Sequence, residues 1–383
     1  MKEPLYDVII VGGGSTGLFL GALLVQAGFS CKVLEQRQHS TTHSRSIGIH
    51  PPALERLAKI GVAEQIRSRG VPVQGGVAFL NKRRVGKLTF SACPPPFPFI
   101  VSLPQCETES ILASRLIELD PSALSRGMQV IRMNESPDEV GVVCLGGDQE
   151  INYRAKFVVG CDGMHSVIRK MTGILFTGGD YADSYLMGDF QDSTAFGPDA
   201  AIYLGRFGVV ECFPLPGGLR RWVVKTDTLL DLPDASALCS LIDQRTGLKV
   251  DETTCSMISA FKVSHFTANT MSKGRIVLAG DSAHVVSPIG GQGMNLGWLD
   301  AFALFEVFEV VLKEGSSHSD QLFSTYSDRR LKAAAKARRR SELNMWLGRD
   351  SKVGFLQNGM IRLILSPIFQ KSFARQFTMR GLE

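Results

Sequence analysis

The chain has 383 residues, of which 44% are hydrophobic and 21% charged, so it is long enough for one large two-part unit or two domains and does not belong to the disordered class. Its formal net charge of +5 is too small to indicate a nucleic-acid partner. It mildly favours anionic ligands, such as phosphates or an acidic substrate.

The cysteines and histidines indicate neither a disulfide framework nor a metal site. The eight cysteines are scattered without a C-x-x-C pair, and the seven histidines lack zinc spacing, so we expect buried, reduced thiols and no metal. No apolar stretch approaches the ~18 residues of a spanning helix. The N-terminal apolar run follows Glu3 and Asp7 and leads into glycines rather than a cleavage site, so we expect a cytoplasmic protein.

The N-terminal segment has the pattern of a dinucleotide-binding βαβ unit. An apolar strand at 7–11 leads to Gly12, Gly14 and Gly17, spaced as G-x-G-x-x-G, and an apolar helical stretch follows at 18–27. The first glycine permits a tight turn, the second lets the backbone approach a pyrophosphate, and the third lets helix and strand pack closely. The alternative is a helix whose glycines only allow tight packing.

A group of polar residues follows the second predicted strand, at 31–35. Glu35 ends that strand, where its carboxylate can accept hydrogen bonds from ribose hydroxyls. Gln36 and Arg37 come next, and Arg45 follows within ten residues of Glu35. An arginine here can bind phosphates through two N–H groups. A solvated loop position is the alternative, and it suits Arg37 better.

Two more acceptor residues stand at element ends in the middle of the chain. Gln105 precedes a helix with leucines on one face, and both a functional and a capping role are open for it. Asp162 and Gly163 follow an apolar strand at 157–160, which is a second acidic strand end or a simple helix cap. Further strands are predicted at 130–133, 140–145 and 151–153, with a hairpin turn at 146–148.

The segment from 181 to 262 differs from the preceding part of the chain, because its short β runs carry no nucleotide-binding motif. We interpret it as a mostly antiparallel substrate platform inserted into the binding domain. Tyr185, Tyr203, Arg206 and His265 lie in the right region for a substrate base, although a structural role is favoured for each.

The segment from 274 to 304 is the second glycine-rich region. A buried strand at 276–279 ends at Gly280-Asp281, and a loop through Pro288 leads to the turn at 290–295 and a long helix. Such a turn offers unpaired backbone N–H groups and the positive end of a helix to a ligand. We interpret it as the cradle for the sugar-alcohol chain and ring of a flavin. An ordinary strand–loop–helix with a capping Asp281 is the alternative.

The C-terminal part is helical and basic. A helix at 321–347 carries a basic, solvated face, and the tail from Lys352 interleaves Phe355, Ile361, Leu365, Phe369, Phe373 and Phe377 with basic residues. An amphipathic helix that packs on the body or on a partner is favoured. Peripheral membrane contact or a lipid substrate is the alternative.

Taken in order, Gly12-x-Gly14-x-x-Gly17, Cys161-Asp162-Gly163 and Gly280-Asp281 resemble the motifs of the single-component flavin-dependent aromatic monooxygenases. This is the family of para-hydroxybenzoate hydroxylase and the ubiquinone-pathway ring hydroxylases. The resemblance spans about residues 5–345. It implies an α/β fold: a Rossmann-like FAD-binding domain, an inserted mostly antiparallel β substrate domain and C-terminal helices.

The resemblance implies the roles of the residues in these motifs. The N-terminal glycines and Thr16 would cradle the FAD pyrophosphate, Glu35 would bind the adenosine ribose, and Val130 would contact adenine through its backbone. Arg45 and Gln105 would contact the cofactor near its phosphates and ribityl chain, and Asp162 would lie by Arg45.

The third motif would bind the flavin itself. Asp281 would bind ribityl hydroxyls, and the backbone of Gly293, Met294 and Asn295 would face the pyrimidine side of the ring. The carbonyl of Pro288 would face the reacting flavin carbon, which makes Pro288 the predicted catalytic position. The full predicted cofactor-binding set is Gly12, Gly14, Ser15, Thr16, Gly17, Glu35, Gln36, Arg37, Arg45, Gln105, Val130, Asp162, Gly163, Asp281, Pro288, Gly291, Gly293, Met294 and Asn295.

The implied activity is hydroxylation of an aromatic or polyketide-like small molecule by an FAD monooxygenase that uses NADPH or NADH and O2 through a C4a-hydroperoxyflavin. A flavin-dependent reductase of an isoprenoid or other double bond, or a non-catalytic FAD-binding protein, is the alternative. A halogenase is disfavoured because W-x-W-x-I-P is absent from the sequence. The predicted division is an FAD-binding domain at 1–74, 102–180 and 268–350, a substrate domain at 75–101 and 181–267, and a helical tail at 351–383.

Overall fold

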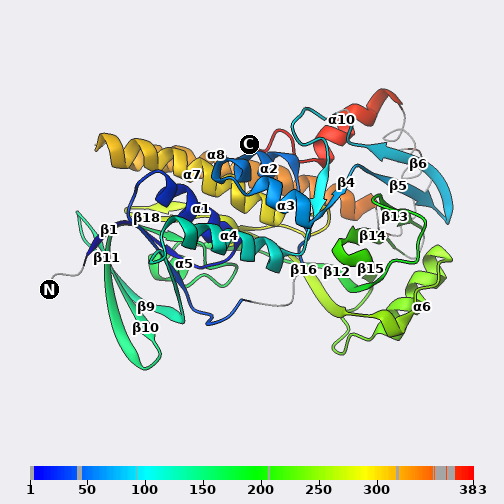
Figure 1. The fold of residues 1–383 in the computed structure, drawn as a ribbon, viewed down its shortest axis with the longest axis horizontal. Helices are drawn as coiled ribbons and strands as arrows, with labels where there is room; N and C mark the ends of the chain where they lie inside the picture. The colour runs from blue at the N-terminus through cyan, green and yellow to red at the C-terminus, as the bar shows by residue number, and fades with distance from the viewer. Residues whose placement is uncertain are drawn as a thin grey trace.

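The chain forms two eight-stranded sheets, which lie toward opposite ends of the view in Figure 1. The computed structural model describes residues 4–40, 45–91, 93–205, 208–315, 319–347 and 367–383, together with residues 349 and 359. None of the helices in these ranges is both long and apolar enough to cross a membrane.

The first sheet has a parallel centre. β1 (Leu5–Val11) lies between β2 (Cys31–Glu35) and β11 (Gln149–Gly160), and β11 pairs in parallel with β18 (Ile276–Leu278). β8 (Leu124–Arg126) extends the sheet beyond β2. Parallel strands are covered on both faces, which explains their apolar sequences. Their carboxyl ends meet at one edge of the sheet, and ligands of open α/β sheets bind at that edge.

Antiparallel strands complete this sheet. β10 (Val140–Gly146) forms a hairpin with β11 and pairs with β9 (Met128–Glu135), while β17 (Ser272–Lys273) pairs with β18. Gly147 in the hairpin turn has a φ of +65°, a backbone conformation that glycine adopts at little cost.

The sequence predicted two strands at 151–153 and 157–160, and this is wrong because β11 runs without a break through both. Arg154 and Ala155 keep their ladder partners, with Arg154 opposite Gly141 and Ala155 opposite Val140. The charged side chains of this stretch do not interrupt the backbone pairing, although they interrupt the apolar pattern.

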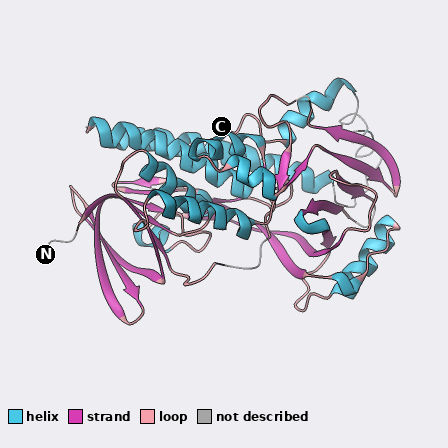
Figure 2. Cartoon of the chain, in the orientation of Figure 1, coloured by secondary structure: helices cyan, strands magenta, loops and turns pink. Residues whose placement is uncertain are grey.

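Four helices cover the first sheet or pack on one another beside it: α1 (Ser15–Gln26), α4 (Gln105–Leu119), α7 (Gly293–Glu314) and α8 (Ser319–Leu347). Figure 2 shows the two longest of these, α7 and α8, running side by side, in agreement with their mutual contacts.

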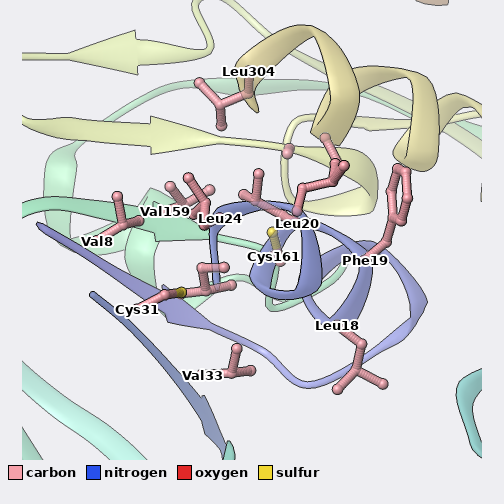
Figure 3. Packing of buried hydrophobic residues seen from close by; sticks show 14 of the residues in the cluster. Val8, Leu18, Phe19, Leu20, Leu24, Cys31, Val33, Val159, Cys161 and Leu304 are labelled. Carbon is pink, nitrogen blue, oxygen red and sulfur yellow. The ribbon is translucent and has the colours of Figure 1, made fainter. Parts of the chain in front are cut away.

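The core between α1 and the parallel strands is apolar on nearly every side of the helix. Leu18 and Phe19 leave α1 on different sides, and Val33 and Val159 meet it from the strands (Figure 3). Each of these side chains is at most 1% exposed. Burial of one such side chain stabilises the fold by roughly 1.5–3 kcal/mol, so this helix is fixed firmly against the sheet.

The second sheet has the order β19-β16-β12-β15-β14-β13-β5-β6. All of its neighbouring strands are antiparallel except β13 and β5, which pair in parallel. Its strands are β5 (Gly75–Leu80), β6 (Arg83–Thr89), β12 (Phe176–Gln191), β13 (Ala200–Leu204), β14 (Val210–Leu215), β15 (Leu219–Thr226), β16 (Met257–Ala268) and β19 (His284–Val285). The prediction of an α/β fold with a mostly antiparallel second part is confirmed.

One face of the second sheet packs on α6 (Ala235–Thr246), whose Leu238 and Ile242 are fully buried against Trp222 and Val210. The other face shares a cavity with residues 45–48 and 288–291, which lie outside this sheet. Residues of a strand alternate between the two faces of the sheet. Every second side chain of these strands therefore points away from α6.

The remaining elements are shorter. A three-stranded sheet has the order β3-β7-β4. These strands and the remaining helices are β3 (Gly48–Ile49), β4 (Val71–Val73), β7 (Ile100–Ser102), α2 (Pro51–Leu57), η1 (Ala58–Ile60), α3 (Ala63–Arg69), α5 (Val167–Thr172), η2 (Pro216–Gly218), η3 (Glu252–Thr254), η4 (Gly280–Ser282) and α10 (Pro367–Phe377). The division into domains by residue range remains a prediction.

The described part of the C-terminal tail packs on the body. Phe377 of α10 stacks on Phe90 at 5.9 Å between ring centroids, and Arg380 forms an ion pair with Glu55 at 2.6 Å. Of the other tail residues singled out from the sequence, Phe355, Ile361, Leu365 and the side chain of Phe369 lie outside the described residues.

Candidate active site

Two cavities adjoin where the two sheets approach each other. A polar cleft of about 680 Å³ lies along the carboxyl edge of the parallel strands, and an apolar cavity of about 220 Å³ lies beside it under the second sheet. Ser46, Pro288 and Gly291 line both of them. A ligand in the cleft can therefore reach a second molecule in the apolar cavity at this boundary.

The polar cleft is lined by every predicted cofactor residue except Gly17, Arg45 and Asn295. These lining residues come from loops far apart in the sequence, and the parallel strands bring them to one edge. Their role in binding FAD remains a prediction, but the structure places them around one space.

The first motif forms an open turn at the amino end of α1. A Cβ on Gly12 would lie 2.3 Å from the carbonyl oxygen of Cys161, and one on Gly17 would lie 2.0 Å from the carbonyl oxygen of Gly12. A Cβ on Gly14 would meet nothing closer than 3.8 Å, at the Glu109 carboxylate. Gly12 and Gly17 are thus required by packing, whereas Gly14 faces the open cleft, as the approach of a pyrophosphate requires.

Glu35 holds the turn of the first motif. One of its carboxylate oxygens accepts a 2.7 Å hydrogen bond from the Gly13 N–H, and the other accepts bonds of 2.9 and 2.8 Å from the backbone and side chain of Arg37. Burial on its own raises the pKa of Glu35, but these hydrogen bonds outweigh burial and lower that pKa below its usual value. Glu35 is therefore an ionised acceptor at neutral pH, and Arg37 is its partner rather than a free solvated side chain.

Asp162 caps a helix and also faces the cleft. Its Oδ2 accepts hydrogen bonds of 2.7 and 3.1 Å from the N–H groups of Val167 and Ile168, at the start of α5. Its Oδ1 is buried without a hydrogen-bond partner among the described residues. Burial raises the pKa of this carboxyl group. The capping interpretation is correct, and the second oxygen leaves an acceptor for a ligand hydroxyl.

Arg45 does not line the cleft that Asp162 lines. Its guanidinium lies over the ring of Phe261, 5.7 Å from the centroid, and the residue lines the apolar cavity. Its backbone carbonyl accepts a 2.8 Å hydrogen bond from Arg221. The predicted position beside Asp162 is therefore wrong for this structure, because the aromatic face of the second sheet holds the Arg45 side chain on the substrate side.

Asp281 projects into the cleft from the turn after β18. Its side chain is exposed to the open space of the cleft, but the surrounding protein removes most of its water and raises its pKa. The nearby His284 acts in the opposite direction and Asp300 adds to the increase. This carboxyl group has the position that a ligand's hydroxyl chain requires.

The start of α7 supplies the third set of donors. The helix begins at Gly293, directly after Gln292, and its first N–H groups have no intrahelical partners. Asn295 is fully buried; its side chain donates to the carbonyls of Gly48 and Gly291 and accepts from the His50 N–H, all at 2.8 Å. Its side chain thus ties this turn to β3, while Gly293 and Met294 line the cleft.

Pro288 lies at the boundary of the two cavities, and its carbonyl oxygen accepts a 2.8 Å hydrogen bond from the Gly291 N–H. This bond closes a tight turn that presents the loop to both spaces. A carbonyl oxygen has a second lone pair, so the Pro288 carbonyl can also face a flavin. This orientation remains a prediction.

The second cavity is bounded by apolar side chains from the inward face of the second sheet. Ile202, Phe213, Val223 and Phe261 contribute from four strands, and Phe377 contributes from α10. An apolar space of this kind is suited to an aromatic ligand.

Sequence reasoning missed several charged residues at this site. Asp300 and His284 lie under the Asp281 turn, Glu109 lines the cleft and accepts a 2.8 Å hydrogen bond from Gln105, and Glu211 lines the apolar cavity. Two of these residues could have been found from the sequence, because each is a single charge within an apolar run. Asp300 interrupts an apolar helix and Glu211 an apolar strand.

The residues proposed as candidate substrate bases lie elsewhere. Tyr203 stacks on Phe79 at 4.3 Å on the α6 side of the sheet, and neither Tyr185 nor His265 lines the apolar cavity. Their structural role was the favoured interpretation. Arg206 lies outside the described residues.

The residues of the cleft fit FAD. The cleft wall carries the open approach at Gly14, the unpartnered oxygen of Asp162, the cleft-facing carboxyl of Asp281 and the free N–H groups at Gly293. These groups suit, in that order, a pyrophosphate, hydroxyl groups and an electron-rich ring edge.

Comparison with known proteins agrees with this geometry. The profile of the FAD binding domain family matches residues 5–341. Rifampicin monooxygenase of Streptomyces venezuelae is 32% identical over 312 residues, covering 78% of this chain and 63% of that protein. Pentachlorophenol 4-monooxygenase of Sphingobium chlorophenolicum is 31% identical over 342 residues, covering 85% of this chain and 62% of that protein. The chain therefore spans less than two thirds of the length of these two relatives.

Among solved structures, p-nitrophenol 4-monooxygenase from Pseudomonas putida DLL-E4 superposes with a TM-score of 0.90 at 23% identity, covering 99% of both chains. At this identity, the likeness establishes the fold. It covers both sheets and the cleft between them.

Proposed function

The chain belongs to the FAD binding domain family, together with the single-component FAD-dependent aromatic monooxygenases, and on that premise we propose that it hydroxylates an aromatic or polyketide-like small molecule with FAD, NADPH or NADH, and O2. The observation that carries the proposal is the pair of adjoining cavities. One has the groups that FAD needs, the other is apolar, and they meet at Pro288 and Gly291. The relatives in this family are monooxygenases, which favours this activity over a double-bond reductase or a non-catalytic binding protein.

The protein's contribution is to bind, orient and shield the cofactor. Bound FAD would supply the oxygen-transfer chemistry, with NADPH or NADH as the reductant and O2 as the source of oxygen. The first-turn N–H groups of α7 and the positive end of its dipole would stabilise negative charge on the ring. Asp281 and Asp162 would accept hydrogen bonds from cofactor hydroxyls, and Glu35 would hold the glycine turn against the phosphates.

The apolar cavity would exclude water from the reacting atoms. Its lining by Ile202, Val223, Phe261 and Phe377 leaves few groups to hold water. Exclusion of water matters because an activated oxygen species that is open to water is lost without transfer. The proximity of both cavities at Pro288 would place the substrate beside the reacting edge of the cofactor.

Location and partners follow from the same proposal. All eight cysteines are free thiols, which supports a reducing, cytoplasmic compartment. The membrane contact considered for the C-terminal tail remains a prediction; in the described part of the tail, Phe373 and Phe377 line the apolar cavity instead.

Turnover with isotopically labelled oxygen tests the proposal. The FAD-loaded protein would be incubated with NADPH or NADH, ¹⁸O2 and a panel of phenols and polyketides, and the products analysed by mass spectrometry. We expect nicotinamide oxidation stimulated by one class of ring compound and a product with one ¹⁸O atom. Saturation of a carbon–carbon bond without O2 uptake would establish the reductase instead, and FAD that accepts no electrons from either nicotinamide would indicate a binding protein.

A further inference from the structure

We propose that Glu211 is the base that accepts the hydroxyl proton of a small phenolic substrate held in the apolar cavity. The proposal rests on the proposed function, because it assigns the substrate class and a catalytic residue of the same cavity.

Strand alternation places Glu211 in the wall of the cavity. In β14, Glu211 and Phe213 line the cavity, whereas Val210 and Cys212 belong to the core on the α6 side. The cross-strand neighbours of Glu211 are Ile202 on β13 and Val223 on β15, and both line the cavity too. The carboxyl group thus stands on an otherwise apolar surface of the sheet.

Within the part of the chain that the structure describes, the Glu211 carboxyl group has no partner that would explain its position. The residue is 9% exposed, and among the described residues none donates a hydrogen bond or forms an ion pair with its carboxyl group. Asp189 gives the contrast, since both of its oxygens bind the guanidinium of Arg221 at 2.7 and 2.8 Å. A buried carboxyl without a partner is costly, and such groups are found where a ligand completes them.

Among the described residues, Glu211 is the carboxyl group that lines the apolar cavity, and the charged groups near it interact with other residues. Arg221 on β15 is paired with Asp189, and Arg45 lies over Phe261. Lys225, also on β15, has Asp183 and Asp227 within 3.9 and 3.2 Å. Two further titratable groups are Tyr185 on β12, whose pKa is raised by burial and then by Glu211, and His50 before α2, whose pKa burial lowers to about 4.

Burial raises the pKa of Glu211 from 4.5 to about 7. Near neutral pH, the acid and its conjugate base are therefore both populated, which is the condition for an efficient general base. An ordinary glutamate on the surface would be a much weaker proton acceptor.

The volume of the apolar cavity suits a small aromatic substrate. A cavity of about 150 Å³ in another protein holds one benzene molecule, so a space of about 220 Å³ holds one substituted ring. One such ring would lie between Phe213 on β14 and the boundary residue Pro288, which both line the cavity. Its hydroxyl group would face Glu211.

The proton transfer is balanced without a further reactant. The phenol O–H bond breaks, the proton forms a new O–H bond on the Glu211 carboxylate, and the electron pair stays on the phenolate oxygen. No atom changes oxidation state in this step. The phenolate is a more electron-rich ring than the phenol, so it reacts more readily with an electrophilic oxygen.

Ligand binding, rather than turnover, gives the direct test. The FAD-loaded wild-type protein and Glu211→Gln would be titrated calorimetrically with 4-methylphenol, which stays protonated in this range, and with its methyl ether, at about pH 6 and about pH 8. Glu252→Gln is the matched control, because Glu252 is an exposed carboxyl of the same part of the chain, in η3.

We expect 4-methylphenol to bind the wild-type protein and Glu252→Gln about tenfold more tightly at the higher pH, because an ionised acceptor adds this much to a buried hydrogen bond. The ether, which has no O–H, should show no such gain, and Glu211→Gln should bind the phenol equally at both values. Failure of the phenol to bind, or the same pH dependence in Glu211→Gln, would overturn the proposal. Because no turnover is measured, this outcome is independent of the ¹⁸O experiment.

Discussion

The imidazole of His284 and the carboxylate of Asp300 form a fully buried hydrogen bond of 2.6 Å beneath the turn that carries Asp281. The same carboxylate accepts a 3.0 Å bond from the Gly280 N–H and a 2.7 Å bond from Arg330 of α8. Burial on its own raises the pKa of Asp300, but the two cationic partners outweigh burial and lower it. One buried carboxylate thus joins α7, α8 and the Asp281 turn.

Asp300→Asn should destabilise the protein by about 3–5 kcal/mol, because it leaves the Arg330 guanidinium buried without an ionised partner. The free energy of unfolding in urea, measured with excess FAD, tests this. Asp328→Asn is the control, since Asp328 is exposed on the same helix as Arg330 and its loss should change the free energy by less than about 0.5 kcal/mol. Equal stability of the two variants would contradict the role of Asp300.

Gly12→Ala should lower the stability of the protein, whereas Gly14→Ala should weaken FAD binding. Gly12 has a φ of +109° and its Cβ would overlap the Cys161 carbonyl, so this variant should lose at least about 2 kcal/mol of stability. The space around Gly14 admits a Cβ, so Gly14→Ala should fold, yet bind FAD at least tenfold more weakly because the methyl group projects toward the pyrophosphate. Thermal unfolding and FAD titration separate the two effects. Normal FAD affinity in Gly14→Ala would argue against this position of the pyrophosphate.

Asp281→Ala should weaken FAD binding by roughly 10- to 100-fold, the loss expected for hydrogen bonds to an ionised acceptor. Glu383→Ala is the control, because Glu383 is exposed and its carboxylate accepts a bond from the Gly381 N–H. Flavin content after gel filtration and the dissociation constant from fluorescence measure the effect. Retention of FAD to the same extent in both variants would place the cofactor elsewhere.

Glu211 should make the stability of the protein depend on pH. Its folded-state pKa of about 7 lies above the ordinary 4.5, so the stability is fully present below about pH 4.5 and is lost as the pH rises toward and through 7. Since one pKa unit corresponds to about 1.4 kcal/mol, ionisation of this group costs up to about 3 kcal/mol at higher pH.

Glu211→Gln should therefore be more stable than the wild-type protein at about pH 8, and the difference should disappear at about pH 5. Urea unfolding of the ligand-free, FAD-loaded proteins at the two values measures this. A difference that does not change with pH would show that Glu211 titrates normally.

The N-terminal unit was predictable because its signals are local. The strand, the glycine turn and the helix lie within one short stretch, and the Gly12 and Gly17 contacts have the roles that their spacing predicts. The assembly of the three motif loops at one edge followed from the rule that parallel strands end together, and the fold class is confirmed.

The rest depended on register and packing, which one sequence does not reveal. Arg45 was assigned to the cofactor side from the family resemblance and its position after Glu35, but its guanidinium lies over the ring of Phe261, over 200 residues away in the chain. The face of β14 that carries Glu211 is decided by its pairing with β13 and β15. The partnership of Asp300 with Arg330 requires the packing of α7 on α8.

The flavin ring should lie where the two cavities meet. A crystal structure of the FAD-loaded protein measures this directly. We expect the pyrophosphate at Gly14, the ribityl chain at Asp281, and the ring against Gly293 and Met294 with its reacting edge toward Pro288 and the apolar cavity. FAD bound with its ring away from Pro288, or absent from the cleft at saturating concentration, would contradict the account.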